Sequence, residues 1–172
     1  MLDKKVVLQV AVMVLAAVIL MPGCGNTVQT GDTNQQQARE YAIKGISYFS
    51  QKQWDQAIAQ YTMAIQIDPN YALAYSNRGS AYGEKGDLSK AIADYTRAIE
   101  LAPTLAETYR NRGIAYGKKG DYDSAIGDLT TAITLDPKDA LSYYNRGAAY
   151  DKKGEKGKAE ADFKKAQELG LK

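Results

Sequence analysis

The sequence YSNRGSAYGEKGD, which spans residues 75–87, recurs almost unchanged at residues 109–121 and again at residues 143–155. Each copy starts 34 residues after the one before it. A fixed period of this length is typical of arrays in which one structural unit is stacked on its neighbours. Gly45 lies a further 34 residues upstream of Gly79, so we predict four copies of one unit. The predicted units are residues 38–71, 72–105, 106–139 and 140–172.

Each unit has the spacing of apolar and small residues that two helices require. In residues 72–105, Tyr75, Gly79 and Tyr82 are spaced i, i+4 and i+7, and a second stripe of this kind begins at Ala91. The unit is therefore expected to be a helical hairpin, and the fold class to be all-α.

A short turn separates the two helices expected in each unit. Gly86 is expected to end the first helix and Asp87 to cap the second, and Gly120 and Asp121 repeat this pair in the next unit. Pro103 is expected to close the second unit because proline cannot continue a helix.

Small and aromatic residues recur at fixed places when residue 38 is counted as position 1. Position 8 is glycine, position 11 is tyrosine and position 20 is alanine in all four units. This pattern resembles the tetratricopeptide repeat. The resemblance implies an α-solenoid of four helix-turn-helix units wound into a right-handed superhelix. The matching glycines are Gly45, Gly79, Gly113 and Gly147, and the matching alanines are Ala57, Ala91, Ala125 and Ala159.

The fourth unit departs from the pattern in its second helix. Position 21 is isoleucine in the first three units but Glu160 in the last, and Gln167 replaces another isoleucine at position 28. These positions face the following unit in a stacked array, so an apolar side chain there would be left in water at the end. The last helix is therefore expected to cap the array.

An arginine and an aspartate recur together in the last three units. Arg78 at position 7 and Asp94 at position 23 are one such pair. We predict a salt bridge between the two helices of each unit, of small energetic value if it is exposed.

The composition excludes several classes of function. With no histidine and one cysteine, the chain lacks the side chains for histidine-based catalysis, Cys/His metal sites and intramolecular disulfides. A net charge of +2, from 22 basic and 20 acidic residues, gives no basic footprint for nucleic acid. The carboxylates are expected to be caps and surface charges, so an enzyme is the least favoured reading. No catalytic residue, cofactor or metal is predicted.

Residues 1–23 have the character of an export signal. Lysines precede an apolar run of 16 residues at 6–21, which is shorter than the roughly 20 residues of a membrane-spanning helix. Cys24 follows, in a context that resembles the lipobox of bacterial lipoproteins, and this resemblance implies a lipid on Cys24. An ordinary signal peptide that leaves a free thiol, or an uncleaved anchor, is the alternative.

Residues 24–37 are predicted to be the lipidation site and a flexible tether. They are rich in Gly, Thr, Asn and Gln and have no apolar periodicity. The lipoprotein resemblance, with Gly25 rather than an aspartate after the cysteine, implies an outer-membrane or outer-surface location. The lipid would then make the bacterial membrane one partner of the chain.

An asparagine stands at position 6 of three units, although asparagine is a poor residue for a helix interior. A row of side-chain amides can pair with the backbone of an extended peptide, because each amide offers an acceptor and two donors. The alternative is that these asparagines only bond to neighbouring helices, and the sequence leaves both readings open. The three residues are Asn77, Asn111 and Asn145.

The family resemblance implies that the first helices of the units line a concave groove. Tyr144 lies outside the packing pattern and is the best candidate for an aromatic that faces a ligand. The carboxylate clamp of chaperone-binding members is not expected, since only Asn77 of its residues is present. The other side chains that the resemblance assigns to the groove are Arg39, Leu73, Phe49 and Arg110.

The favoured function is a non-enzymatic protein–protein interaction module, an envelope-anchored adaptor that binds an extended peptide segment in the groove. The alternative is a structural component of an envelope assembly that acts through its convex face or through self-association. The chain is expected to be a monomer or a weak oligomer.

Overall fold

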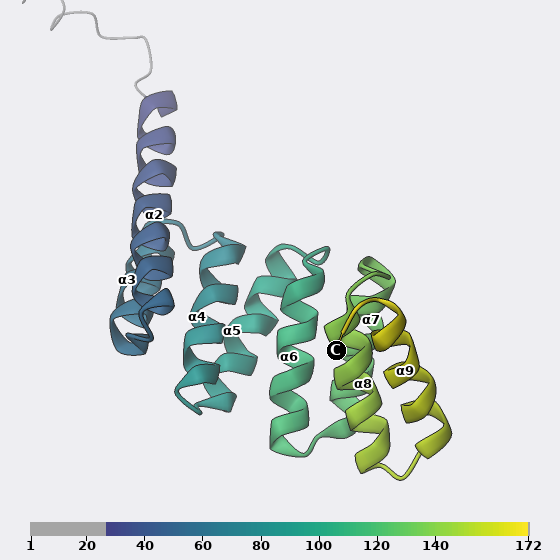
Figure 1. Ribbon diagram of the computed structural model, residues 1–172. Helices are drawn as coiled ribbons and strands as arrows, with labels where there is room; N and C mark the ends of the chain where they lie inside the picture. Colours follow the sequence, from purple (N-terminus) through teal and green to yellow (C-terminus); the bar gives the residue numbers. More distant parts are fainter. Residues whose placement is uncertain (1–26, 172) are drawn as a thin grey trace, which may run out of the picture. The chain divides into compact units, whose positions relative to one another are not determined.

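The computed structural model describes residues 27–171, with side chains from residue 33 onward. All elements of this part of the chain are helices, and they follow one another in pairs along the array (Figure 1). This confirms the all-α solenoid of four helix-turn-helix units. The helices are α2 (Thr27–Ser50), α3 (Trp54–Ile67), α4 (Ala72–Glu84), α5 (Leu88–Leu101), α6 (Ala106–Lys119), α7 (Tyr122–Leu135), α8 (Ala140–Lys152) and α9 (Lys156–Glu168).

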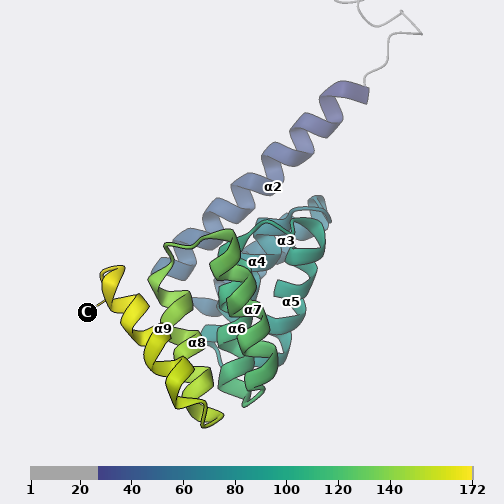
Figure 2. The same ribbon diagram turned by 90° about the vertical axis from the view of Figure 1, so that its right-hand side faces the viewer.

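The two helices of each unit cross closely at the glycine of position 8. A Cβ atom placed on Gly113 of α6 would lie 2.8 Å from Leu129 Cγ and 3.2 Å from the carbonyl oxygen of Ala125, both on α7. Only a residue without a side chain permits this approach. The pairs α4 with α5, α6 with α7 and α8 with α9 are therefore tight hairpins (Figures 1 and 2).

The turns inside the hairpins have the predicted chemistry. Gly86 and Gly120 adopt φ values of 87° and 85°, which favour glycine. The side chain of Asp87 accepts a hydrogen bond from the backbone N–H of Lys90 at 3.2 Å, and Asp121 caps α7 in the same way. Both predicted caps are thus confirmed.

The core is itself periodic and lies across the junctions between units. Ala91 and Tyr95 of α5 pack with Ala115 of α6, and a matching cluster recurs at each neighbouring junction. Ile92 covers the cluster at its edge. Each unit therefore buries part of its apolar surface only when the next unit is present.

The recurring arginine and aspartate form a stronger contact than a surface pair. Arg112 donates two parallel hydrogen bonds to the carboxylate of Asp128, with N···O distances of 2.7 and 2.8 Å. Its remaining Nη1 atom donates to Thr96 Oγ1 of the preceding unit at 3.0 Å. The same three-residue contact recurs at Arg78 and at Arg146. The predicted bridge is therefore confirmed, and it also ties neighbouring units together.

The end of the array is polar on α9, as predicted. Glu160 and Gln167 are both exposed, whereas the corresponding isoleucines of earlier units are half-buried or, at Ile65, buried. The first helix of the same unit is less well covered, since Leu141 and Tyr144 keep 46% and 48% of their surface exposed.

Helix α2 begins at Thr27 rather than near Ala38, so it includes residues 27–37 of the predicted tether. Residues 33–37 of this helix are exposed, so it continues beyond the part that packs. A run of glutamines without proline permits this extension, since glutamine is a good helix former. The predicted signal and Cys24 lie outside the described residues. Among the described helices, none is long and apolar enough to cross a bilayer.

Candidate functional site

A prominent hollow on the described surface is lined by the first helices of three units. It has a volume of about 500 Å³ and receives side chains from α2, α4 and α6, with the rings of two second-helix tyrosines among its walls. We call it the central hollow. Its lining includes Ile46, Phe49, Tyr61, Asn77, Ser80, Gly83, Glu84, Tyr95, Glu107, Asn111, Ile114 and Lys118.

A glycine, Gly83, opens this hollow. Position 12 is Phe49 in the first unit but Gly83 and Gly117 in the next two, so the helix surface there has no side chain. A Cβ atom on Gly83 would meet only Ala91 Cβ and the Tyr95 hydroxyl, both at 3.9 Å. Packing therefore does not require glycine at residue 83, in contrast to the close crossings at position 8.

The three predicted asparagines do not lie in one environment. Asn77 and Asn111 line the central hollow, and both are half-buried. In the described part of the chain, neither amide has a hydrogen-bond partner. Asn145 lines a separate hollow between α6 and α8 and donates from Nδ2 to the backbone oxygen of Leu141 at 2.7 Å. Bonding within the scaffold thus accounts for Asn145, while Asn77 and Asn111 remain available.

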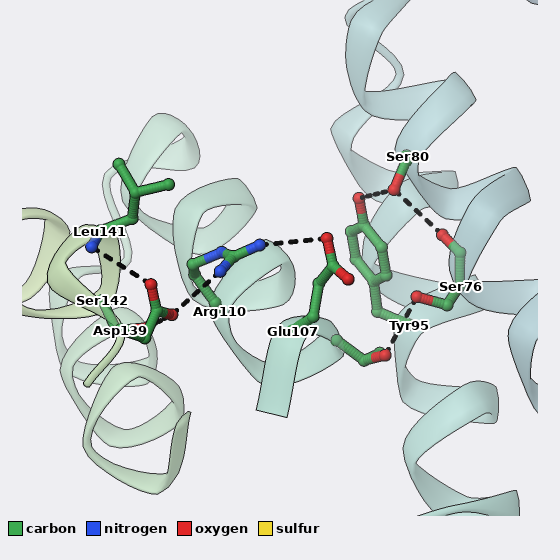
Figure 3. A network of polar contacts seen from close by, with 9 residues as sticks. Ser76, Ser80, Tyr95, Glu107, Arg110, Asp139, Leu141 and Ser142 are labelled. Atoms are coloured by element: carbon green, nitrogen blue, oxygen red, sulfur yellow. Dashed lines mark hydrogen bonds and ion pairs between the residues drawn. The ribbon is translucent and has the colours of Figure 1, made fainter. Parts of the chain in front are cut away.

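A polar network lies beside the central hollow, and two of its members, Ser80 and Tyr95, line that hollow (Figure 3). The hydroxyls of Ser76 and Thr108 lie 3.0 Å apart across the junction of α4 and α6, and both side chains are buried. Ser80 donates to the backbone oxygen of Ser76, and the Tyr95 hydroxyl donates to Ser80 Oγ at 3.2 Å. Burial raises the pKa of Tyr95, so its hydroxyl stays protonated and remains a donor. The hydroxyl groups of this network are thus already hydrogen-bonded to one another or to the backbone.

Arg110, predicted to face a ligand, instead joins two units. Its guanidinium pairs with Glu107 on its own helix and with Asp139 in the turn before α8, at 3.1 and 3.0 Å (Figure 3). Asp139 also accepts a short hydrogen bond from Ser142 Oγ. Burial acts to raise the pKa of Asp139, but the hydrogen bonds from Ser142 and Arg110 outweigh it and hold that pKa below its usual value. Arg110 is therefore committed to the scaffold.

The remaining predicted side chains are spread along the array. Phe49 lines the central hollow, and Leu73 shares a smaller one of about 210 Å³ with Asn77 and Asn111. Arg39 lies in a separate hollow near the turn that precedes α4. The ring of Tyr144 packs at a tilt of 50° against the ring of Phe163 on α9, with ring centroids 5.5 Å apart, at the end of the array. The structure thus brings four of the eight predicted residues into one region, namely Asn77, Asn111, Phe49 and Leu73.

The analysis of single positions missed a row of charges at the groove rim. Position 13 is occupied by Glu84, Lys118 and Lys152 in the last three units, and all three side chains are exposed. Within the described residues, none of them takes part in an ion pair. Position 13 belongs to the groove in the repeat pattern, so a reading along that position would have found them.

The described residues contain no cluster of three or more Cys, Asp or Glu side chains that could hold a metal ion. The central hollow presents two amides, unpaired charged side chains and an apolar wall to a ligand.

Comparison with protein families agrees with this architecture. A model described as "TPR repeat" matches residues 45–86, 79–120 and 115–154, and one described as "Tetratricopeptide repeat" matches residues 140–169. Together the matches extend over most of the chain. The protein therefore belongs to the tetratricopeptide repeat family, whose members generally mediate protein–protein interactions. A search among curated proteins gives no match.

Several solved structures share the fold. A crystal structure of MamA is 29% identical with a TM-score of 0.73, and the alignment covers 83% of this chain and 82% of that one. The first TPR of Spaghetti (RPAP3), bound to the HSP90 peptide SRMEEVD, is 26% identical with a TM-score of 0.69, covering 70% and 95%. The Arabidopsis OM64 TPR domain is 26% identical with a TM-score of 0.67, covering 69% and 98%.

Proposed function

We propose that the protein is a non-enzymatic interaction module that holds an extended segment of a partner protein in the central hollow. The observation that carries this proposal is the pair of half-buried amides, Asn77 and Asn111, which face the hollow without a hydrogen-bond partner in the described chain. These amides carry hydrogen-bonding capacity that the scaffold does not use, although most side-chain amides in protein interiors are paired. An occupant of the hollow could supply hydrogen bonds to both amides.

The chemistry of these amides suits a peptide backbone. Each offers a carbonyl oxygen to a backbone N–H and an NH₂ group to a backbone C=O. Because asparagine carries no charge, such contacts would select an extended backbone rather than a particular side chain. Ile46 and Phe49 on the wall would add contact with apolar side chains.

The peptide recognised by the RPAP3 repeat domain is not the occupant that we propose. Ala42, which replaces one lysine of the carboxylate clamp, is buried. Glu107 replaces another, so the cation that would receive a terminal carboxylate is missing there. The SRMEEVD peptide is therefore a useful negative probe for this hollow.

The test is to fill the hollow without disturbing the fold. Gly83→Leu places a side chain in the central hollow, where a Cβ has room. Gly127→Leu on α7 is the matched control, because a Cβ there points into open space. We expect the full chain to capture peptides from a random 12-residue array, the control to capture the same ones, and Gly83→Leu to lose them. Equal capture by both variants would place binding elsewhere and contradict the proposal.

We also propose that the module is anchored to the bacterial cell envelope through a lipid on Cys24. The support is the sequence context of Cys24, which lies outside the described residues. Mass spectrometry of the purified protein is expected to show an acylated N-terminal cysteine, with the modification absent from Cys24→Ser. An unmodified thiol in the intact protein would contradict the anchor.

A second candidate function, assembly through self-association, is favoured by one observation. Leu141 and Tyr144 leave an apolar surface exposed beside α9. If this surface joined copies of the chain, Tyr144→Ser would lower the mass measured by sedimentation. A monomeric wild type would remove this candidate.

A further inference from the structure

A second hollow adjoins the central one and carries two unpaired lysines. It has a volume of about 260 Å³, lies between α6 and α8, and shares Ile114 and Lys118 with the central hollow. Lys152 and Asn145 complete its polar lining, and Ala148 contributes to an apolar wall. We call it the lysine hollow. Neither lysine has an ion-pair partner in the described part of the chain, so both can receive an acidic group.

The opposite end of the groove is apolar. Ile43, Ile46 and Phe49 are spaced i, i+3 and i+6 on α2 and form one stripe. Ile43 and Ile46 keep 65% and 52% of their surface exposed, although both are large apolar side chains. Leu73 at the start of α4 is 50% exposed as well. Large apolar side chains gathered in this way indicate a contact surface.

Between these two ends, the groove carries an unpaired carboxylate. Glu84 lines the central hollow without an ion-pair partner among the described residues, whereas Glu107 is neutralised by Arg110. Glu84 is the last residue of α4, where a negative charge opposes the helix dipole. Helix stability therefore does not account for Glu84. From α2 to α8, the groove is thus apolar at the stripe on α2, negative at Glu84 and positive at the lysine hollow.

We propose that the occupant of the groove is an extended protein segment that carries an apolar side chain at one end and an acidic side chain at the other. The apolar side chain would cover the stripe on α2. The acidic side chain would enter the lysine hollow, with its methylene groups against Ile114 and Ala148 and its carboxylate near Lys118 and Lys152. This inference rests on the proposed function and adds the identity and the order of the side chains that the groove selects.

The separation between the two anchors follows from the geometry of the array. Neighbouring helices pack about 8–10 Å apart, and the lysine hollow lies between α6 and α8, about two and a half such intervals from α2. An extended chain advances roughly 3.3 Å per residue, so the acidic residue would lie about six to eight residues from the apolar one. Glu84 would disfavour an acidic residue in the intervening stretch.

The test uses the full chain on an array of random 12-residue peptides. We expect captured peptides to be enriched in Asp or Glu about six to eight residues from Ile, Leu or Phe. The double variant Lys118→Glu/Lys152→Glu is expected to bind those peptides at least about tenfold more weakly. The peptides that it captures are expected to be enriched in Lys or Arg instead. Lys118→Gln/Lys152→Gln removes the charges without opposing the helix dipoles, and it is expected to abolish the acidic preference.

The control Lys156→Glu/Lys164→Glu changes the net charge equally but lies on α9, outside both hollows. It is expected to keep the wild-type peptides. If the wild type captures peptides without an acidic preference, or if the control acts like the groove variant, this inference is overturned while the proposed function stands. If the wild type captures no peptide at all, the proposed function fails and the inference fails with it.

Discussion

At the scale of single residues, we expect the stability of the array to depend on a partly buried arginine in each of its last three units. Arg112 forms two hydrogen bonds with Asp128, a third with Thr96, and lies over the ring of Tyr109 at 5.8 Å. The arginine and aspartate side chains keep only 16% and 11% of their surface exposed. Loss of one partner would leave the other charge buried and unpaired, which is far more costly than loss of an exposed pair.

We therefore predict that Arg112→Ala lowers the free energy of unfolding by about 3 kcal/mol. Arg97→Ala, which breaks the exposed pair with Glu100, is expected to cost less than about 1 kcal/mol. Urea denaturation followed by circular dichroism would measure both. Similar losses for the two variants would show that the buried contact has no special role.

The glycines provide a second comparison at this scale. Gly113→Ala would force a Cβ to within 2.8 Å of Leu129 Cγ, so we expect a loss of about 1–3 kcal/mol in unfolding free energy. Gly127→Ala meets open space on α7, and we expect it to stabilise the protein by about 0.5–1 kcal/mol. Thermal denaturation would separate the two, and a stabilising Gly113→Ala would contradict the close crossing.

At the scale of helices, the sequence predicts those helices that pack against others, because packing leaves an apolar pattern in the sequence. Helices α3 to α9 follow from apolar periodicity and from turn residues such as Gly86 and Asp87, and their structure agrees with the prediction. The start of α2 could not be found in this way. Residues 33–37 are all polar and exposed, so no apolar pattern marks them and only helix propensity could indicate them.

The junction of α6 and α8 is expected to depend on pH. The lowered pKa of Asp139 means that its charged form stabilises the folded state. That contribution is complete above the ordinary pKa of 3.8 and is lost as the pH falls from there through the lowered value. Asp139→Asn keeps the helix cap but removes the charge. We predict a smaller loss of melting temperature between pH 7 and pH 3 in this variant than in the wild type.

Glu160→Gln is the control for this pH comparison, because it removes an exposed carboxylate from α9. It is expected to leave the acid-induced loss at its wild-type size. An unchanged pH dependence in Asp139→Asn would mean that the contacts with Arg110 and Ser142 do not stabilise the junction.

At the scale of the whole array, each inner unit is covered on two sides and each outer unit on one. The clusters at Ala91 and Ala125 lie between units, so opening of a middle helix requires the loss of two interfaces. We predict that the backbone amides of α4 to α7 exchange hydrogen more slowly than those of α8 and α9. Exchange followed by mass spectrometry would measure this, and uniform protection would contradict additive stacking.

The candidate site could be predicted from the sequence only as a set of positions. Asn77 and Asn111 were identified because they repeat, and repetition could not reveal that Asn145 bonds to its own helix. Arg110 was assigned to the groove, yet its role depends on Asp139, a residue in a turn 29 positions away. Contacts between units determine which side chains remain free to bind a ligand. These contacts cannot be inferred from the sequence of a single repeat.

The most direct test of the account is to observe the two amides while the groove is occupied. Nuclear magnetic resonance of the full chain, with the asparagine side-chain NH₂ signals assigned through single Asn→Ala variants, would follow the addition of a peptide captured on the array. We predict that the signals of Asn77 and Asn111 shift at saturation, while that of Asn34, exposed on α2, does not. Saturating peptide that leaves the Asn77 and Asn111 signals unchanged would contradict the proposed binding groove.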